Sequence, residues 1–241
     1  MVNMMREHVP QETRIHYIIT RGGAAPNIVP DFAESYYYAR HPDMRILEGI
    51  WDRIIDAARG AALGTGTTTE LEVTGAVYNV LPNRYLSAVM QRHLERVGGY
   101  RYTAEEQTFA EELRKTTTVP SDRPLGMQEK VDPLKDTEAA DSGSTDVGDV
   151  SWNVPTVQMT GATFVPGIAP HSWQAAACAG HSIGVKGMMV AAKTMALMAV
   201  DLFSTPEHIA KTKAEFDQKR GPGFLYKSRL DGRQPPLNYR E

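Results

Sequence analysis

The chain has 241 residues, of which 41% are hydrophobic and 23% are charged, and its formal net charge is -3. These proportions are typical of a globular protein and exclude a disordered or fibrous one. The slight negative charge argues against a nucleic-acid or anionic-membrane partner, because both require a concentrated positive field. The one cysteine, Cys178, excludes an internal disulfide, so we expect a reducing compartment.

The start of the chain and its most apolar stretch predict a cytoplasmic protein with no membrane partner. The first residues do not combine a basic start with an apolar run of leader length. Residues 187–203 are the most apolar, but Lys193 and Asp201 interrupt them, and the uncharged piece between is too short to span a bilayer. We therefore predict that these residues form a buried helix.

Residues 1–81 predict a small α+β domain. In order, the patterns predict a helix end at residues 1–8, strands at 14–19 and 33–40, a helix at 46–62 and a third strand at 67–73. The strands are rich in β-branched and aromatic residues, and the helix places Ile46, Ile50 and Ile54 on one face. This order of elements predicts a sheet with helices on one face.

Residues 82–241 predict a second, mixed domain. The patterns predict helices at 84–97 and from Thr103, a polar loop at 115–149, a strand at 156–165, a short helix at 172–178, a helix at 187–203, a last helix to about Arg220 and an extended tail at 221–241. Thr103 and Glu106 have the spacing of a capping box, which explains the acidic pair Glu105–Glu106 without any chemistry. Residues 150–185 contain no Asp, Glu, Lys or Arg, which predicts buried loop and strand.

Residues 180–184 read Gly-His-Ser-Ile-Gly and match the nucleophile elbow of serine hydrolases. That motif requires a strand before Ser182, whereas residues 174–177 are helix formers. Asp201 and His208 follow in the order of a catalytic triad, but they lie too close in sequence to reach around a hydrolase sheet. A glycine-bounded turn between two buried helices is the better interpretation.

His171 follows a loop with two prolines and lies within the uncharged stretch. An imidazole that is held rigidly and away from water suits metal binding or general acid–base catalysis. A hydrogen-bonded structural histidine is the alternative, and it is the commoner role for a lone histidine.

A glycine-rich loop at residues 21–31 contains Asn27, and the strand after it ends at Arg40. The loop has no G-x-G-x-x-G motif and no helix follows it, which argues against a phosphate cradle. Asn27 offers an amide to a ligand, and an arginine such as Arg40 can bind a carboxylate with two parallel hydrogen bonds. A turn and a surface arginine explain the same residues equally well.

Several of these segments together resemble the aminoacylase/carboxypeptidase G-type metallo-amidohydrolases. Residues 22–31 with the strand to Arg40 resemble the lid (dimerisation) domain of that family. Residues 144–151 and 169–174 resemble motifs in the C-terminal part of its catalytic domain. Residues 60–67 and 78–83 resemble its p-aminobenzoyl-glutamate hydrolase branch. The resemblance extends to about Arg220. It implies a small α+β lid followed by the C-terminal part of an α/β metallopeptidase domain.

The resemblance implies that a water activated by two divalent ions, zinc or manganese, hydrolyses the amide bond of N-acyl or N-aroyl amino acids such as aminobenzoyl-glutamate. At the matching positions, His171 is expected to be a metal ligand, and Asp146 to lie beside the metal or in the substrate pocket. Asn27 and Arg40 are expected to hold the substrate carboxylate or the oxyanion across a dimer. The expected partner is an identical chain or a related subunit, joined through the lid domain.

The resemblance also implies that most of the site lies outside this chain. The family's H-x-D motif, its bridging carboxylate and the Glu-Glu pair with the general base all precede the lid. We therefore predict a C-terminal portion that has no catalytic residue of its own and is inactive by itself. The alternative is a non-catalytic dimerisation or interaction module that pairs through the strand around Tyr37 and the helix at 46–62.

Overall fold

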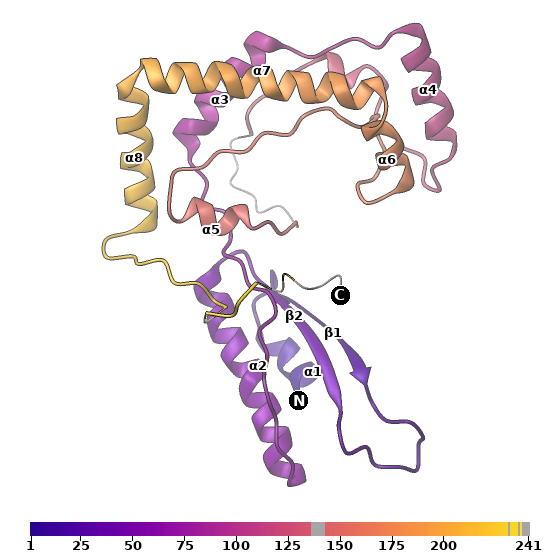
Figure 1. Ribbon diagram of the computed structural model, residues 1–241, viewed down its shortest axis with the longest axis vertical. Coiled ribbons are helices and arrows are strands. Elements are labelled where there is room, and N and C mark those ends of the chain that lie inside the picture. The colour runs from indigo at the N-terminus through magenta and orange to yellow at the C-terminus, as the bar shows by residue number, and fades with distance from the viewer. Residues whose placement is uncertain (136–142, 231, 236, 238–241) are drawn as a thin grey trace. The chain divides into compact units, whose positions relative to one another are not determined.

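The structure, a computed structural model, describes residues 1–135, 143–230, 232–235 and 237, and Figure 1 shows its elements. Unit 1 comprises Met1–Val80, Ala140–Asp149 and Tyr226–Glu241, and unit 2 comprises Leu81–Ala139 and Val150–Leu225. Residues 136–142 of the predicted loop and residues 231, 236 and 238–241 of the predicted tail lie outside the described residues.

Unit 1 is built on a β-hairpin and one long helix (Figure 1). Its elements are α1 (Val2–Met5), the 3-10 turn η1 (Arg6–His8), β1 (Arg14–Arg21), β2 (Glu34–Arg40) and α2 (Met44–Thr65). The strands run antiparallel with Tyr17 opposite Tyr37, and the two rings stack with their centroids 5.2 Å apart. One face of α2 packs against β1 and α1, with Ile15, Ile50 and Ile54 buried in a common core. The two predicted strands and the helix are confirmed. Of the predicted helix face, Ile50 and Ile54 are buried, whereas Ile46 is 42% exposed.

The third strand predicted at residues 67–73 is wrong. After α2 ends at the left-handed residue Gly66 (φ 66°), residues 67–80 run without regular structure, and most of them are exposed. Among their bonds are two from the C-terminal segment: the Arg233 guanidinium donates to the carbonyl of Thr74 at 2.7 Å and pairs with Glu72 at 3.0 Å. A strand requires a neighbouring strand, and β1 and β2 pair only with each other in the described part of the chain.

Unit 2 is helical in its described residues. Its helices are α3 (Arg84–Val97), α4 (Ala104–Lys115), the 3-10 turn η2 (Met127–Glu129), α6 (Trp173–Ala179), α7 (Ser182–Ser204) and α8 (Pro206–Arg220), and α5 (Val147–Ser151) continues into it from unit 1. The capping box predicted at Thr103 and Glu106 is confirmed. The structure adds a cap at Asn83, whose side chain accepts from the amide of Leu86 at 2.9 Å.

The strand predicted at residues 156–165 is also absent from the structure. Its side chains still alternate as in a strand, because Val157 and Met159 pack against a buried cluster around Val89 whereas Gln158 and Thr160 are exposed. No neighbouring strand lies beside it among the described residues. The fold is therefore mixed α+β, mostly helical, with a two-stranded antiparallel sheet in the described residues, and the α/β sheet implied by the resemblance is not formed there.

Helix α7 is longer and more exposed than predicted. It begins at Ser182, and by length and composition alone it could cross a membrane, although many core helices of soluble proteins meet the same test. In its most apolar 18-residue stretch, 28% is buried. Its exposed apolar side chains are Val185, Met188, Met189, Met195, Val200 and Phe203. The opposite face is tightly packed: a Cβ at Gly184 would lie 2.6 Å from the Cys178 carbonyl oxygen, and one at Gly187 would collide with that of Ala162. The prediction of a fully buried helix is wrong.

Candidate functional site

The two residues expected to hold a substrate carboxylate lie at opposite ends of the hairpin in unit 1. Asn27 is exposed in the loop between β1 and β2, and Arg40 is exposed at the end of β2. β2 contains 7 residues, and a strand rises about 3.3 Å per residue, so Arg40 lies about 20 Å from the loop end of the strand. Within this chain, Asn27 and Arg40 are therefore not brought together around one small ligand.

Arg40 lies opposite a second arginine. Its register partner across the hairpin is Arg14, whose guanidinium donates to the carbonyls of Gln11 and Thr13 at 2.8 and 2.9 Å. Like charges opposite one another on a sheet are unfavourable. The Arg40 guanidinium lies 5.8 Å from the centre of the Tyr38 ring. This end of the hairpin is thus positively charged and exposed, as a site for an anion requires.

Asp146 is exposed immediately before α5, and its neighbour Asp149 is the carboxylate that the structure holds in place. Asp149 accepts hydrogen bonds from the amide of Tyr78 at 3.3 Å and from the hydroxyl of Tyr226 at 2.8 Å. Gly148 packs so closely on Tyr78 that a Cβ there would collide with the Tyr78 carbonyl oxygen. Sequence reasoning chose the first acid of this motif and missed the second.

His171 lies in a strained loop of unit 2. Its φ of 60° is the one positive φ of a non-glycine residue in the described part of the chain, and its side chain is exposed. The next residue caps α6: the Ser172 hydroxyl accepts from the amide of Ala175 at 3.2 Å and donates to the Ala169 carbonyl at 2.7 Å. The left-handed region costs an L-residue about 1 kcal/mol or more, and such strain is commoner at functional sites than elsewhere. His171 is therefore presented to solvent at an energetic cost.

The described residues do not fit a complete metal centre. They contain no group of three or more His, Cys, Asp or Glu side chains arranged to hold a metal ion. The chain does contain an H-x-D sequence at residues 41–43, which the sequence reasoning overlooked. There, however, Asp43 caps α2 by accepting from the amide of Arg45 at 2.8 Å, and His41 Nδ1 accepts from the amide of Asp43 at 2.9 Å. We assign no catalytic step to a metal held by this chain.

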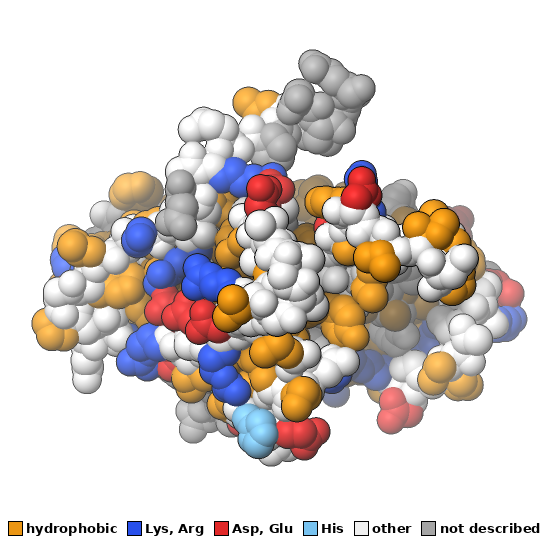
Figure 2. Space-filling view, turned by 90° about the horizontal axis from the view of Figure 1, so that it is seen from below, with side chains coloured by type: hydrophobic (Ala, Val, Ile, Leu, Met, Phe, Trp, Pro, Cys, Tyr) orange, Lys and Arg blue, Asp and Glu red, His pale blue; other side chains and the backbone are white. Residues whose placement is uncertain are grey.

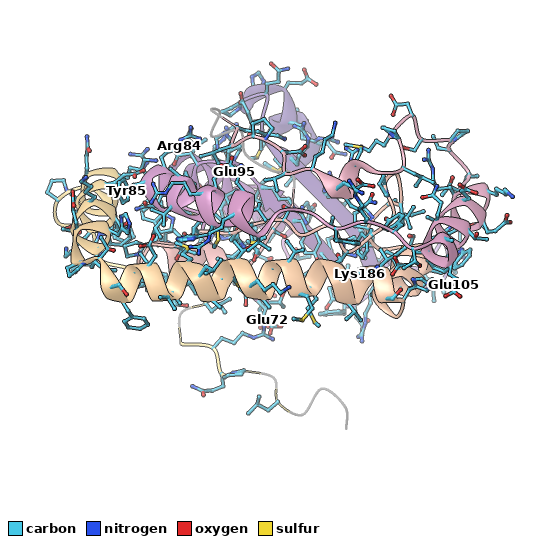
Figure 3. All side chains as sticks on the ribbon, turned by 90° about the horizontal axis from the view of Figure 1, so that it is seen from above. Glu72, Arg84, Tyr85, Glu95, Glu105 and Lys186 are labelled. Carbon is cyan, nitrogen blue, oxygen red and sulfur yellow. The ribbon has the colours of Figure 1, made fainter. Side chains whose placement is uncertain are left out.

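A buried ion pair between Glu106 and Lys186 joins α4 and α7 in unit 2, and Figure 3 labels Lys186. The Glu106 side chain is 4% exposed, and its Oε2 accepts from Lys186 Nζ at 2.6 Å. Its other oxygen accepts from the Ser182 hydroxyl at 2.6 Å, and the amide of Thr103 adds a bond of 2.7 Å. Burial acts to raise the pKa of Glu106, but Lys186, Ser182 and Thr103 together outweigh it and lower this pKa from 4.5 to about 2. The residue that the sequence assigned to a cap alone is thus also a buried anion.

The same geometry excludes Ser182 as the nucleophile of a serine hydrolase. Its hydroxyl donates to Glu106, and helix α6 precedes it instead of a strand. Asp201 lies near the far end of α7, which at 1.5 Å per residue is about 28 Å from Ser182. The predicted turn between two helices is confirmed at Gly180 and His181, whereas residues 182–184 already belong to α7.

Asp201 belongs to a different cluster, which ties α3, α7 and α8 together. His93 Nε2 and His208 Nε2 lie 2.9 and 3.3 Å from the same Asp201 oxygen, and the Tyr85 hydroxyl lies 2.7 Å from His208 Nδ1. The hydrogen bond from His93 is the largest influence on the pKa of Asp201, which is lowered. The side chains of this cluster therefore connect α3, α7 and α8 by polar contacts, and we assign the cluster a structural role in unit 2.

Comparison with known proteins relates this chain to a group of hydrolases. It is 35% identical to a subunit of p-aminobenzoyl-glutamate hydrolase from Escherichia coli (strain K12) over an alignment 240 residues long, which covers 90% of this chain and 50% of that protein. It is 27% and 28% identical to the Xaa-Arg dipeptidases of Mus musculus and Homo sapiens, over 90% of this chain and 44% and 43% of those proteins. The chain is homologous to these hydrolases.

The homology confirms the resemblance found in the sequence. No family model matches the chain. The chain spans about half the length of the relatives it matches. Part of their sequence therefore has no counterpart here.

Proposed function

We propose that this chain is one part of a metal-dependent hydrolase that cleaves the amide bond of N-acyl or N-aroyl amino acids, aminobenzoyl-glutamate above all. The observation that carries the proposal is the identity of 35% to the p-aminobenzoyl-glutamate hydrolase of E. coli across 90% of the chain. The other relatives are dipeptidases by name, and a dipeptidase also cleaves an amide bond next to an amino acid. The shared chemistry is thus amide hydrolysis of an amino-acid derivative.

In this proposal His171 is one ligand of the zinc or manganese ion. Its exposure and its left-handed backbone suit a side chain held outward for a partner group. The remaining ligands and the general base come from the part of the enzyme that this chain does not match, because the described residues provide no metal-binding group. We predict that this chain alone does not turn over substrate. Asp146 is proposed to lie beside the metal.

Arg40 is proposed to bind the carboxylate of the substrate. It is exposed at the positive end of the hairpin, beside Arg14, and a carboxylate there relieves the repulsion between the two guanidinium groups. Asn27, at the other end of the hairpin, is proposed to act on a different group, the oxyanion that forms at the scissile carbonyl. The lid is proposed to bring these residues to the site of a partner, either an identical chain or a related subunit; the relative in E. coli is itself named as a subunit.

A chimera tests the proposed function. In it, this chain replaces the matching half of the E. coli relative and is fused to the complementary part, which we define as the half of that relative that this chain does not match. We expect the chimera to hydrolyse aminobenzoyl-glutamate when zinc or manganese is supplied, and His171→Ala to reduce turnover to background. His16→Ala, which removes an exposed histidine on β1, is the control and should leave turnover unchanged.

Three results would contradict parts of the proposal. A chimera that is folded and metal-loaded but inactive rejects the assigned chemistry. Full turnover by the His171→Ala chimera rejects the ligand role of His171. Turnover by the unfused chain with zinc or manganese rejects the prediction that it is inactive by itself.

The second candidate function is a non-catalytic interaction module. It is favoured by apolar side chains that the hairpin leaves exposed, among them Ile18 at 60% and Tyr38 at 51%. Figure 2 shows hydrophobic side chains at the surface among acidic and basic ones on one face of the molecule. An inactive chimera together with a chain that forms a dimer at micromolar concentration supports this candidate. A monomeric chain with an active chimera rejects it.

A further inference from the structure

Residues 156–160 have the side-chain pattern of a strand, but no strand lies beside them among the described residues. Val157 and Met159 point into the cluster formed by Leu86, Val89, Met90 and Met198, and the side chains of Gln158 and Thr160 between them are exposed. This alternation with a period of two is the side-chain pattern of a strand that has one face on a core. The local sequence therefore specifies a strand, and helices α3 and α7 already cover one face of it.

The backbone of this segment is free for pairing. Among the described residues, no hydrogen bond joins a backbone N–H or C=O of residues 156–160 to another group. The first bonds on either side are those of the Val154 carbonyl, which accepts from the Thr156 hydroxyl at 3.0 Å, and of the Gly161 carbonyl, which accepts from the amide of Thr163 at 2.9 Å. An unpaired row of N–H and C=O groups is a template for an added strand.

The end of the segment is fixed in place. Residue 187 of α7 is a glycine, and a Cβ there would collide with the Ala162 carbonyl. Because Gly187 has no Cβ, α7 and the backbone of Ala162 approach each other more closely than a larger residue at position 187 would permit. Val165 is 1% exposed in a second buried cluster. The segment is therefore held against the helices by its side chains while its backbone edges stay unpaired.

We propose that residues 156–160 are an open β-strand edge that pairs with a strand of the complementary part. The relatives are about twice as long as this chain, so the complementary part can supply several strands. A second copy of this chain offers a weaker alternative: pairing the same segment with itself gives an isolated two-stranded ribbon, which is marginally stable in water. The segment lies in a stretch without charged residues, so the strand that pairs with it is expected to be uncharged as well. The inference rests on the homology and not on the proposed activity.

Hydrogen exchange tests the inference. The probe is the complementary part of the E. coli relative, co-expressed with this chain as a separate polypeptide, and the covalent chimera provides a second measurement that needs no association. In the chain alone we expect the amides of residues 156–160 to exchange freely. In the complex and in the chimera we expect them to exchange at least about tenfold more slowly, as paired amides do.

Proline variants identify the edge that is used. Gln158→Pro and Met159→Pro each remove one N–H, and because these point to opposite sides of a strand, at least one variant should weaken the complex about tenfold or more. Gln158→Ala and Met159→Leu keep the N–H and are the matched controls, which should bind as the parent chain does. Circular dichroism of each variant checks that the helices remain folded.

Four results overturn the inference. They are the absence of a complex, a complex in which the amides of residues 156–160 still exchange freely, protection of these amides in the chain alone, and equal binding by both proline variants and their controls. These readouts do not depend on turnover. An inactive chimera with protected amides rejects the proposed function only, and an active chimera with freely exchanging amides rejects only the strand edge.

Discussion

Replacing Lys186 by methionine isolates the buried ion pair of unit 2. Lys186→Met removes the ammonium group and keeps most of the volume of the side chain, so Glu106 remains buried without its counter-ion. Glu106 is 4% exposed and Lys186 is 34% exposed in their side chains. Removing one partner of a buried pair is expected to destabilise strongly, because the remaining charge stays in a site of low dielectric constant.

The pKa of Glu106 sets the magnitude. It is lowered from 4.5 to about 2, and a difference of this size between the folded and unfolded states corresponds to about 3 kcal/mol at neutral pH. This is an upper value, because water screens the partly exposed ammonium group. Because the pKa of Glu106 is lower in the folded state than in the unfolded state, the ionised carboxylate contributes its full stabilisation above pH 4.5. This stabilisation is lost as the pH falls from 4.5 through about 2. In Lys186→Met, burial is opposed only by the hydrogen bonds from Ser182 and Thr103, so the pKa of Glu106 is lowered less than in the parent and the variant loses less stability as the pH falls.

Urea unfolding followed by circular dichroism measures the loss at pH 7 and at intervals down to pH 2. Lys211→Met is the matched control, because Lys211 pairs with Glu207 at the same distance of 2.6 Å but the two side chains are 53% and 67% exposed. The control should change the free energy of unfolding little. The reasoning is refuted if Lys186→Met is no more destabilising than Lys211→Met, or if the loss at pH 7 persists unchanged at pH 2.

Three further predictions concern packing, the histidine cluster and strain. Gly187→Ala should destabilise by about 1–3 kcal/mol through overpacking against Ala162, whereas Gly49→Ala, which meets nothing within 4 Å, should stabilise α2 by about 0.5–1 kcal/mol; urea unfolding measures both, and equal effects contradict the packing argument. Asp201→Asn should lower the melting temperature at pH 7, and the difference should shrink in acid, since the pKa of Asp201 is lowered by the hydrogen bond from His93 and then by other contacts; a difference independent of pH contradicts this. His171→Gly should raise stability by about 0.5–1 kcal/mol by relieving the left-handed backbone, and an unchanged or lower value contradicts the strain.

Sequence reasoning identified the capping box of α4, but it placed the start of α7 at residue 187 instead of Ser182 and missed the buried ion pair. Thr103 and Glu106 lie three residues apart, so their capping box can be read directly from the sequence. Lys186 lies 80 residues from Glu106, and no local pattern connects them. A clue was nevertheless present, since Lys186 is the first charge after an uncharged stretch and follows Ser182 by one helical turn.

The candidate site shows the same division. The motifs that carry the resemblance were found from the sequence, and the homology confirms it. The sequence could not show that Arg40 lies opposite Arg14 in the hairpin, nor that Asp149 is held by Tyr78 and Tyr226. These facts depend on turns and on contacts between distant segments, which residue types alone do not specify.

The sequence by itself determined the helices, their caps and the hairpin of this protein, because those hydrogen bonds join residues close together in the chain. Only the tertiary structure decided whether residues 67–73 and 156–165 become strands, since each needs a neighbour that the sequence pattern does not supply. Both segments have strand-like sequences, and neither is paired with a strand among the described residues. The physical reason is that a helix satisfies its backbone within itself, whereas a strand satisfies its backbone only against another strand.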